Sequence, residues 1–348
     1  MTPSQRCIYY ARCPVPTASG IALHRGMFEQ QFAGSDVSVV NIGESGAANA
    51  NAHFTHDLDN FIREGGCTPP IWARSRGART RLLGITFMRE PLGVYVRSDD
   101  DIETVTDLAG RRLALPVWPR LVFNFWRVAA HKGFLSALDA HGMQASDVNF
   151  IDVTEDKDPH RRLNLALGEA AGNDDKSEYD DQLQALLCGD VDAIFAKGAE
   201  STILVRQSRG RIRLLYDINQ SSDVRHQVNN STPRLLTCSE ELLDDHARDV
   251  ETYLAAIVHA AHWAEDDPQD LRTFVASECG IRVRDIDLYF PDGYNDEFLP
   301  ILSDEFIGLS NVMKEFMLEQ RYIENDFSID DWAVSAPMAN ALAAAAST

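Results

Sequence analysis

The stretch DLAGRRLALP (residues 107–116) decides the fold class, because it places a short helical turn and Gly110 directly before an apolar run. A helical pattern, a glycine-containing turn and an apolar run follow one another again in DDQLQALLCGDVDAIFAK (180–197). Apolar runs that alternate with helical patterns are typical of α/β proteins. We therefore expect an α/β fold.

The same alternation extends in both directions from this stretch. Apolar runs predict strands at 7–11, 36–42, 79–86, 92–98, 148–153, 210–218 and 233–239. Helical spacing predicts helices within 17–32 and 122–143, and a mostly helical chain from Glu240 onward, with a break at Asp267–Pro268. The charged segments 155–162 and 168–178 are expected to be loops.

Length and charge limit the class of protein and its partners. The 348 residues suggest two domains. A hydrophobic content of 45% and a charged content of 24% are ordinary for a globular enzyme. The formal net charge of −21 makes nucleic acid and anionic membranes poor partners, since a negative field repels phosphates.

The two ends of the chain and its cysteines indicate the compartment. Residues 1–6 are polar and no apolar stretch approaches the length of a membrane span, so we expect no signal peptide and a cytoplasmic location. The six cysteines show neither a C-x-x-C pair nor ligand spacing with histidine, which predicts free thiols and no structural zinc.

The opening stretch and the later LLCGDVDAIF (186–195) resemble the second lobe of type II periplasmic-binding-protein folds. In that family a DL-x-G turn leads into the first strand of the second lobe, and an L-x-x-G-x-V-D-A junction follows. The resemblance implies two lobes, residues 1–98 plus 235–348 and residues 99–234, with the chain crossing near 96–100 and 232–238. A cleft between lobes is where ligands bind.

A thiol stands where the first predicted strand ends, in CIYYARCPVP (7–16). The carboxyl ends of strands in open α/β sheets face the ligand site, so Cys13 is a candidate functional residue. The N-terminus of the following helix would favour a thiolate there. The alternative is that Cys13 is a small buried residue in a turn, as free cysteines commonly are.

A second group of candidates lies in residues 51–86. His53 and His56 offer imidazoles, Arg63 offers a guanidinium that binds oxyanions with two hydrogen bonds, and Gly65–Gly66 offers bare backbone N–H groups. With Cys13 they would make an oxyanion site with a reactive sulfur. The alternative is that these polar residues are solvated surface groups on a loop.

Four short segments carry a more specific resemblance: RCPVP (12–16), HFTHDLDNFIREGG (53–66), PP (69–70) and RTRLLGIT (79–86). They resemble the aryl-sulfinate desulfinases, and the close match lies within the first 90 residues. The resemblance implies a two-lobed fold, no metal, no organic cofactor and a catalytic set of Cys13, His53 and Arg63.

Further site residues are expected around this catalytic set. The resemblance implies that Arg63 and the Gly66 N–H bind the substrate, and the bare backbone of the Gly65–Gly66 turn adds Gly65 as a candidate substrate-binding residue. In PVWPRLVFNFW (116–126), Trp118, Phe123 and Trp126 could shape an aryl pocket, and the alternative for these aromatics is core packing. NNST (229–232) fits a glycosylation acceptor, which a cytoplasmic protein would not use.

The function implied by the resemblance is cleavage of the C–S bond of a small anionic, aromatic sulfinate, with release of sulfite. Cys13 could act as a general acid or as a nucleophile, and the sequence does not choose between them. One alternative is a cytoplasmic solute-binding module that binds an anion without turnover. Another is a cysteine-dependent enzyme of different chemistry on the same scaffold. The sequence is compatible with a monomer but does not set the oligomeric state.

Overall fold

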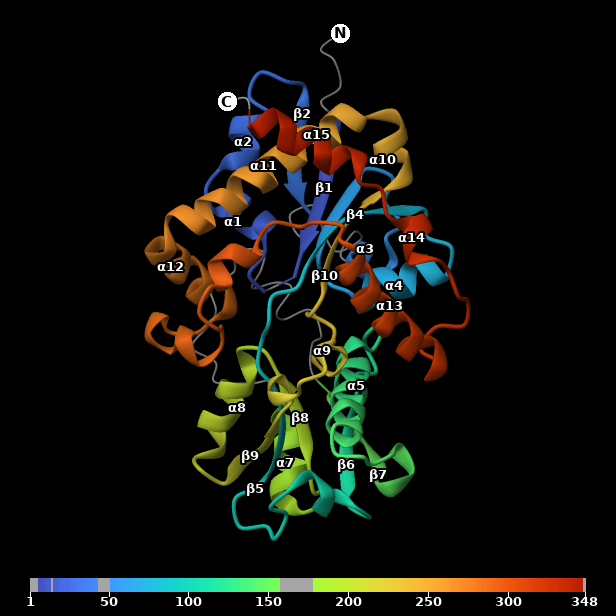
Figure 1. Ribbon diagram of the computed structural model, residues 1–348, viewed down its shortest axis with the longest axis vertical. Helices are drawn as coiled ribbons and strands as arrows, with labels where there is room; N and C mark the ends of the chain where they lie inside the picture. Colours follow the sequence, from blue (N-terminus) through green and yellow to red (C-terminus); the bar gives the residue numbers. More distant parts are fainter. Residues whose placement is uncertain (1–5, 14, 43–50, 157–177, 347–348) are drawn as a thin grey trace.

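The computed structural model describes residues 6–13, 15–42, 51–156 and 178–346. Two α/β lobes follow one another along the long axis of the molecule (Figure 1). The expected α/β class is therefore confirmed. The expected loops at 155–162 and 168–178 lie almost entirely outside the described residues.

The first lobe is built on a five-stranded sheet with the order β2-β1-β3-β10-β4. Its strands are β1 (Arg6–Arg12), β2 (Val37–Asn41), β3 (Phe61–Gly66), β4 (Thr80–Thr86) and β10 (Arg234–Ser239). β1 pairs in parallel with both β2 and β3, whereas β10 pairs antiparallel with β3 and β4. Because β1 and β3 are parallel neighbours, Cys13 and Gly66 emerge at the same edge of the sheet.

Helices from both ends of the sequence cover this sheet (Figure 1). They are α1 (Ala18–His24), α2 (Met27–Gln31), α3 (Ala52–Thr55), α4 (Thr68–Ser75), α10 (Glu240–Asp245), α11 (Ala247–Asp266), α12 (Pro268–Cys279), α13 (Asp304–Glu319), α14 (Ile329–Trp332) and α15 (Ala336–Ala345). The expected break between α11 and α12 is confirmed: Pro268 is the first residue of α12, and the Asp267 side chain accepts a hydrogen bond from the Asp270 N–H.

The second lobe contains two smaller sheets. Their strands are β5 (Leu92–Arg97), β6 (Arg112–Val117), β7 (Asn149–Thr154), β8 (Ile194–Lys197) and β9 (Ile212–Asp217). β5 lies between β8 and β9, and β6 pairs in parallel with β7. The lobe also holds the helices α5 (Phe125–Asp139), α7 (Asp180–Cys188), α8 (Glu200–Ser208) and α9 (Val224–Gln227). The 3₁₀ helix η1 (Val105–Leu108) leads into β6, as the opening stretch of sequence predicted.

The structure corrects the first boundary between the lobes. Residues 92–98 were expected in the first lobe, but β5 pairs with β8 and β9, and its apolar side chains are buried with Leu113 and Phe134 of the second lobe. The first crossing is therefore 87–91, and the second, 228–233, directly precedes β10.

A shared apolar cluster joins the two lobes. Phe123, just before α5, and Val128, in its first turn, are buried with Ile71 of α4 and Met313 of α13. This packing holds α5 against the first lobe. Within the described residues, no helix combines the length and the hydrophobicity that a membrane crossing requires.

Candidate active site

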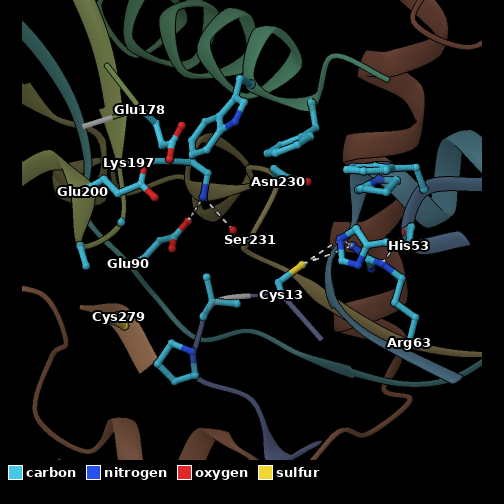
Figure 2. A pocket seen from close by; sticks show the side chains of 18 of the residues that line it. Cys13, His53, Arg63, Glu90, Glu178, Lys197, Glu200, Asn230, Ser231 and Cys279 are labelled. Atoms are coloured by element: carbon cyan, nitrogen blue, oxygen red, sulfur yellow. Dashed lines mark hydrogen bonds and ion pairs between the residues drawn. The ribbon is translucent and has the colours of Figure 1, made fainter. Parts of the chain in front are cut away.

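The sulfur of Cys13 lies among three nitrogen atoms that come from β3 and from α3 (Figure 2). Arg63 Nη2 donates to Sγ at 3.3 Å, the Gly66 N–H donates at 3.4 Å, and His53 Nε2 lies 3.7 Å away. The Cys13 N–H donates to the Glu64 carbonyl at 3.2 Å and fixes the turn after β1. The structure thus brings together the three residues that the sequence proposed as a catalytic set.

Arg63 is fully buried in β3, and its guanidinium holds the surrounding backbone. Nε donates to the His53 carbonyl at 3.1 Å, and Nη1 donates to the Gly66 carbonyl at 3.0 Å. Among the described residues, no carboxylate forms an ion pair with it. Burial lowers the pKa of Arg63, an effect that the nearby Cys13 thiol opposes. Because a guanidinium keeps its proton in proteins, this site presents a buried positive charge suited to an anion.

The alternative that Arg63 is a solvated surface group on a loop is wrong. Phe61–Gly66 is a strand whose residues are all buried. Arg63, Glu64 and two glycines interrupt its apolar pattern, so local hydrophobicity does not reveal it. Its position beside β1 is what brings Arg63 next to Cys13.

Gly65 and Gly66 leave the backbone bare where the thiol packs. A Cβ at Gly65, whose φ is +155°, would lie 2.2 Å from Cys13 Sγ. A Cβ at Gly66 would lie 2.6 Å from the Asn230 carbonyl oxygen. Glycine at position 65 therefore leaves room for the sulfur, and glycine at position 66 leaves room for Asn230.

These groups line one end of a cavity between the lobes that holds about 940 Å³ of space, part of it open to solvent. Phe54, Phe125 and Trp126 supply aromatic wall. The rings of Phe54 and Phe125 stack with their centroids 5.9 Å apart. The cavity therefore combines an anion-binding end with walls that suit a flat apolar group.

The far side of the cavity is polar and buried (Figure 2). Lys197, at the end of β8, donates to Glu90 Oε1 at 2.8 Å and to Ser231 Oγ at 2.7 Å. Its ammonium lies 5.9 Å from the ring centroid of Trp126. Because Glu90 belongs to the first crossing and Ser231 to the second, Lys197 ties both crossings to the second lobe. Glu90, Lys197 and Ser231 could not be predicted as a group from the sequence, since nothing local connects residues so far apart in the chain.

The predicted aromatics have different surroundings. Trp126 lines the cavity, whereas Trp118 stacks on Trp126 at 6.4 Å and does not line it. Phe123 stacks on Trp72 at 5.2 Å in the apolar cluster between the lobes. The expectation that Trp118 and Phe123 shape the pocket is therefore corrected: α5 begins only at Phe125, and its first turn, not the preceding loop, faces the cavity.

His56 does not join the thiol. It ends α3 in the left-handed conformation, with φ at 54°, and its ring packs on Phe61 at 5.7 Å. Burial, reinforced by the charge of Arg63, lowers the pKa of His56 to about 3. In the part of the chain that the structure describes, no three His, Cys, Asp or Glu residues are grouped so that they could hold a metal ion.

The fold and this site define a two-lobed α/β protein of the type II periplasmic-binding-protein class with a thiol in its ligand cavity. Among solved structures, a mutant of the desulfurization enzyme DszB in complex with biphenyl-2-sulfinic acid matches with a TM-score of 0.75 and 22% identity, covering 98% of this chain and 99% of that one. The periplasmic aliphatic sulphonate binding protein SsuA from Escherichia coli matches with a TM-score of 0.63 and 17% identity, covering 94% and 97%.

Sequence comparison agrees with the structural one. 2'-Hydroxybiphenyl-2-sulfinate desulfinase from Rhodococcus erythropolis is 25% identical over 96% of this chain and 93% of its own length, and the enzyme from Rhodococcus qingshengii gives the same values. The NMT1/THI5-like family model matches residues 68–160. The chain is thus a distant homologue of this desulfinase on a scaffold that it shares with SsuA, and the homology extends well beyond the first 90 residues.

Proposed function

We propose that this protein is a sulfinate desulfinase, which cleaves the C–S bond of an aryl sulfinate and releases sulfite. The observation that carries this proposal is the position of Cys13 Sγ between Arg63 Nη2, the Gly66 N–H and His53 Nε2. The distant homology to 2'-hydroxybiphenyl-2-sulfinate desulfinase supports it. So does the aromatic wall of Phe54, Phe125 and Trp126.

The donors at the thiol would also hold the substrate. The oxygens of a sulfinate bound beside Cys13 would accept hydrogen bonds from Arg63 Nη2 and the Gly66 N–H, which also donate to Cys13 Sγ. The sulfur of the sulfinate would then lie next to Sγ. Hydrogen bonds to charged groups are worth more than neutral ones, and preorganised donors need no rearrangement when charge moves onto the leaving group. The aryl ring would then extend along the aromatic wall.

The overall reaction is R–SO₂⁻ + H₂O → R–H + HSO₃⁻, and two routes fit the geometry. As a general acid, the Cys13 thiol would protonate the ring carbon while the C–S bond breaks, and the SO₂ formed would take up water and return a proton to the thiolate. As a nucleophile, Cys13 would bond to the substrate sulfur and form a thiosulfonate-like intermediate. The thiol proton would go to the ring carbon, and water would then release bisulfite. His53 would orient or polarise the thiol in either route.

A solute-binding module is the second candidate, because SsuA shares the scaffold. A module that only binds an anion has no need of a thiol at the anion-binding end. A cysteine-dependent enzyme of other chemistry is the third candidate, and a substrate panel separates it from a desulfinase.

The decisive test is sulfite release by the purified protein from a panel of aryl and alkyl sulfinates, with isothermal titration of sulfinates and sulfonates in parallel. We expect sulfite from aryl sulfinates, and a loss of about 10²–10⁴-fold in Cys13→Ser. Cys188→Ser, which changes an exposed thiol, is the matched control and should retain activity. Tight anion binding without product would favour the binding module, and full activity of Cys13→Ser would refute the catalytic assignment.

A further inference from the structure

Asn230 is a cavity-lining residue on the second crossing, within the NNST segment that the function above leaves unused. It is only 5% exposed. Its backbone carbonyl accepts a hydrogen bond from the Cys67 N–H at 2.6 Å, which ties the crossing to the start of α4. In Figure 2, Asn230 is seen in the cavity wall between Lys197 and His53.

The hydrogen bonds of Asn230 fix the orientation of its side-chain amide. Oδ1 accepts from the Thr68 N–H at 3.2 Å and from the Thr68 hydroxyl. A backbone N–H can only donate, so the amide oxygen must face Thr68, and Nδ2 lies at the other end of the amide. Among the described residues, Nδ2 has no hydrogen-bond acceptor.

The side-chain amide of Asn230 lies against the anion-binding end of the cavity. Its Oδ1 and Nδ2 are 2.8 Å and 2.9 Å from the position that a Cβ would take on Gly66, the residue whose N–H points at Cys13 Sγ. In the cavity wall, an N–H donor without a protein acceptor is available to a ligand oxygen.

We propose that Asn230 is a further substrate-binding residue, whose Nδ2 donates to an oxygen of the bound sulfinate or sulfonate. The identity of this anion rests on the proposed function. Arg63, the Gly66 N–H and Asn230 then form a set of donors that suits an anion with oxygens pointing in several directions. Asn230 is neutral and precedes Ser231, the partner of Lys197. An anion bound to Asn230 would therefore contact the second crossing, residues 228–233, which joins the two lobes.

The test uses the full-length Cys13→Ser protein, which keeps the site and turns over too slowly to deplete the ligand during a titration. It is titrated calorimetrically with benzenesulfinate and benzenesulfonate. Asn230→Asp replaces the N–H donor with a carboxylate oxygen, so the Kd for both anions should rise about tenfold or more. Asn230→Ser removes the donor without adding charge and should weaken binding less. Asn124→Asp adds the same charge at the N-cap of α5, outside the cavity lining, and should change the Kd by less than about twofold.

Thermal unfolding of each variant and the change Thr68→Val separate binding from structure. Thr68→Val removes one hydrogen-bond partner of Asn230 Oδ1 but leaves Nδ2 in place. It should therefore lower the melting temperature, and it should raise the Kd for the two anions less than Asn230→Asp does. Unchanged affinity in a folded Asn230→Asp or Asn230→Ser protein overturns the proposal. A loss of affinity in Thr68→Val as large as that in Asn230→Asp also overturns it. If both anions bind through Asn230 but no sulfinate yields sulfite, the desulfinase proposal fails and this one stands. If neither anion binds the parent protein, both fail.

Discussion

Gly65 and Cys13 pack so closely that a Cβ on Gly65 would lie 2.2 Å from the cysteine sulfur. Gly65→Ala must therefore displace the thiol from the Gly66 N–H and from Arg63. We expect sulfite release to fall about 10²-fold, since small displacements of a reacting group cost that much. Gly77→Ala is the matched control, because Gly77 also has a positive φ but has open space around it. Gly77→Ala should lower stability by about 1–2 kcal/mol, the cost of a left-handed conformation for a residue with a Cβ, and should leave activity unchanged. Equal activity of the two variants would contradict the packing argument.

His53→Gln tests whether the imidazole orients the thiol or transfers the proton itself. Glutamine can still place a hydrogen-bonding group near Sγ, 3.7 Å from the present Nε2, but it cannot take up a proton at neutral pH. We expect measurable residual sulfite release, well above that of Cys13→Ser. Steady-state kinetics with one aryl sulfinate provides the comparison. A loss as large as that of Cys13→Ser would instead make His53 an obligatory proton carrier.

Arg63→Lys keeps the positive charge but removes the planar fork. Lysine cannot reach the His53 carbonyl, the Gly66 carbonyl and Cys13 Sγ at once, as the guanidinium does. Each lost charged hydrogen bond is worth about 1.5–3 kcal/mol. We therefore expect a lower melting temperature and a Kd for benzenesulfinate raised about tenfold or more. The exposed Arg120→Lys should alter neither quantity.

The burial of His56 predicts a loss of stability on mild acidification. Its pKa is lowered to about 3, so the folded protein holds the ring neutral while the unfolded chain takes up a proton below its ordinary pKa of 6.5. Between pH 6.5 and about 3 the unfolded state binds more protons, and the free energy of unfolding falls by up to about 1.4 kcal/mol per pH unit. Denaturant unfolding at pH 5 and pH 7 measures this difference. It should be smaller in His56→Gln, and an identical difference in both proteins would contradict the assignment.

The ion pair between Lys197 and Glu90 predicts a strong coupling between β8 and the first crossing. Lys197→Met leaves the Glu90 carboxylate buried without its cation, which costs about 3–5 kcal/mol. Adding Glu90→Gln should restore much of this stability because the uncompensated charge is gone. A double-mutant cycle from chemical denaturation measures the coupling. Additive effects of the two changes would show that the pair does not tie the first crossing to β8.

The order of elements could be predicted because its signals are local. The break between α11 and α12 follows from Asp267–Pro268, and β6 follows from the turn before it. These signals act over a few residues, through capping, proline geometry and the period of apolar side chains. The assignment of 92–98 to the first lobe failed because an apolar strand does not specify which sheet it joins.

For the site, the sequence by itself determined which reactive groups are present: a thiol after the first strand, an imidazole, a guanidinium and two adjacent glycines. Only the tertiary structure decided their distances, because β1 and β3 are neighbours through sheet pairing and not through sequence. The tertiary structure also decided that Trp126 lines the cavity and that Phe123 does not. It brought Asn230, and Lys197 with its partners Glu90 and Ser231, into the same cavity wall. The physical reason is that these contacts join residues as far apart in the chain as Thr68 and Asn230, which are separated by 162 positions, and such pairs form only when packing of the whole chain brings them together.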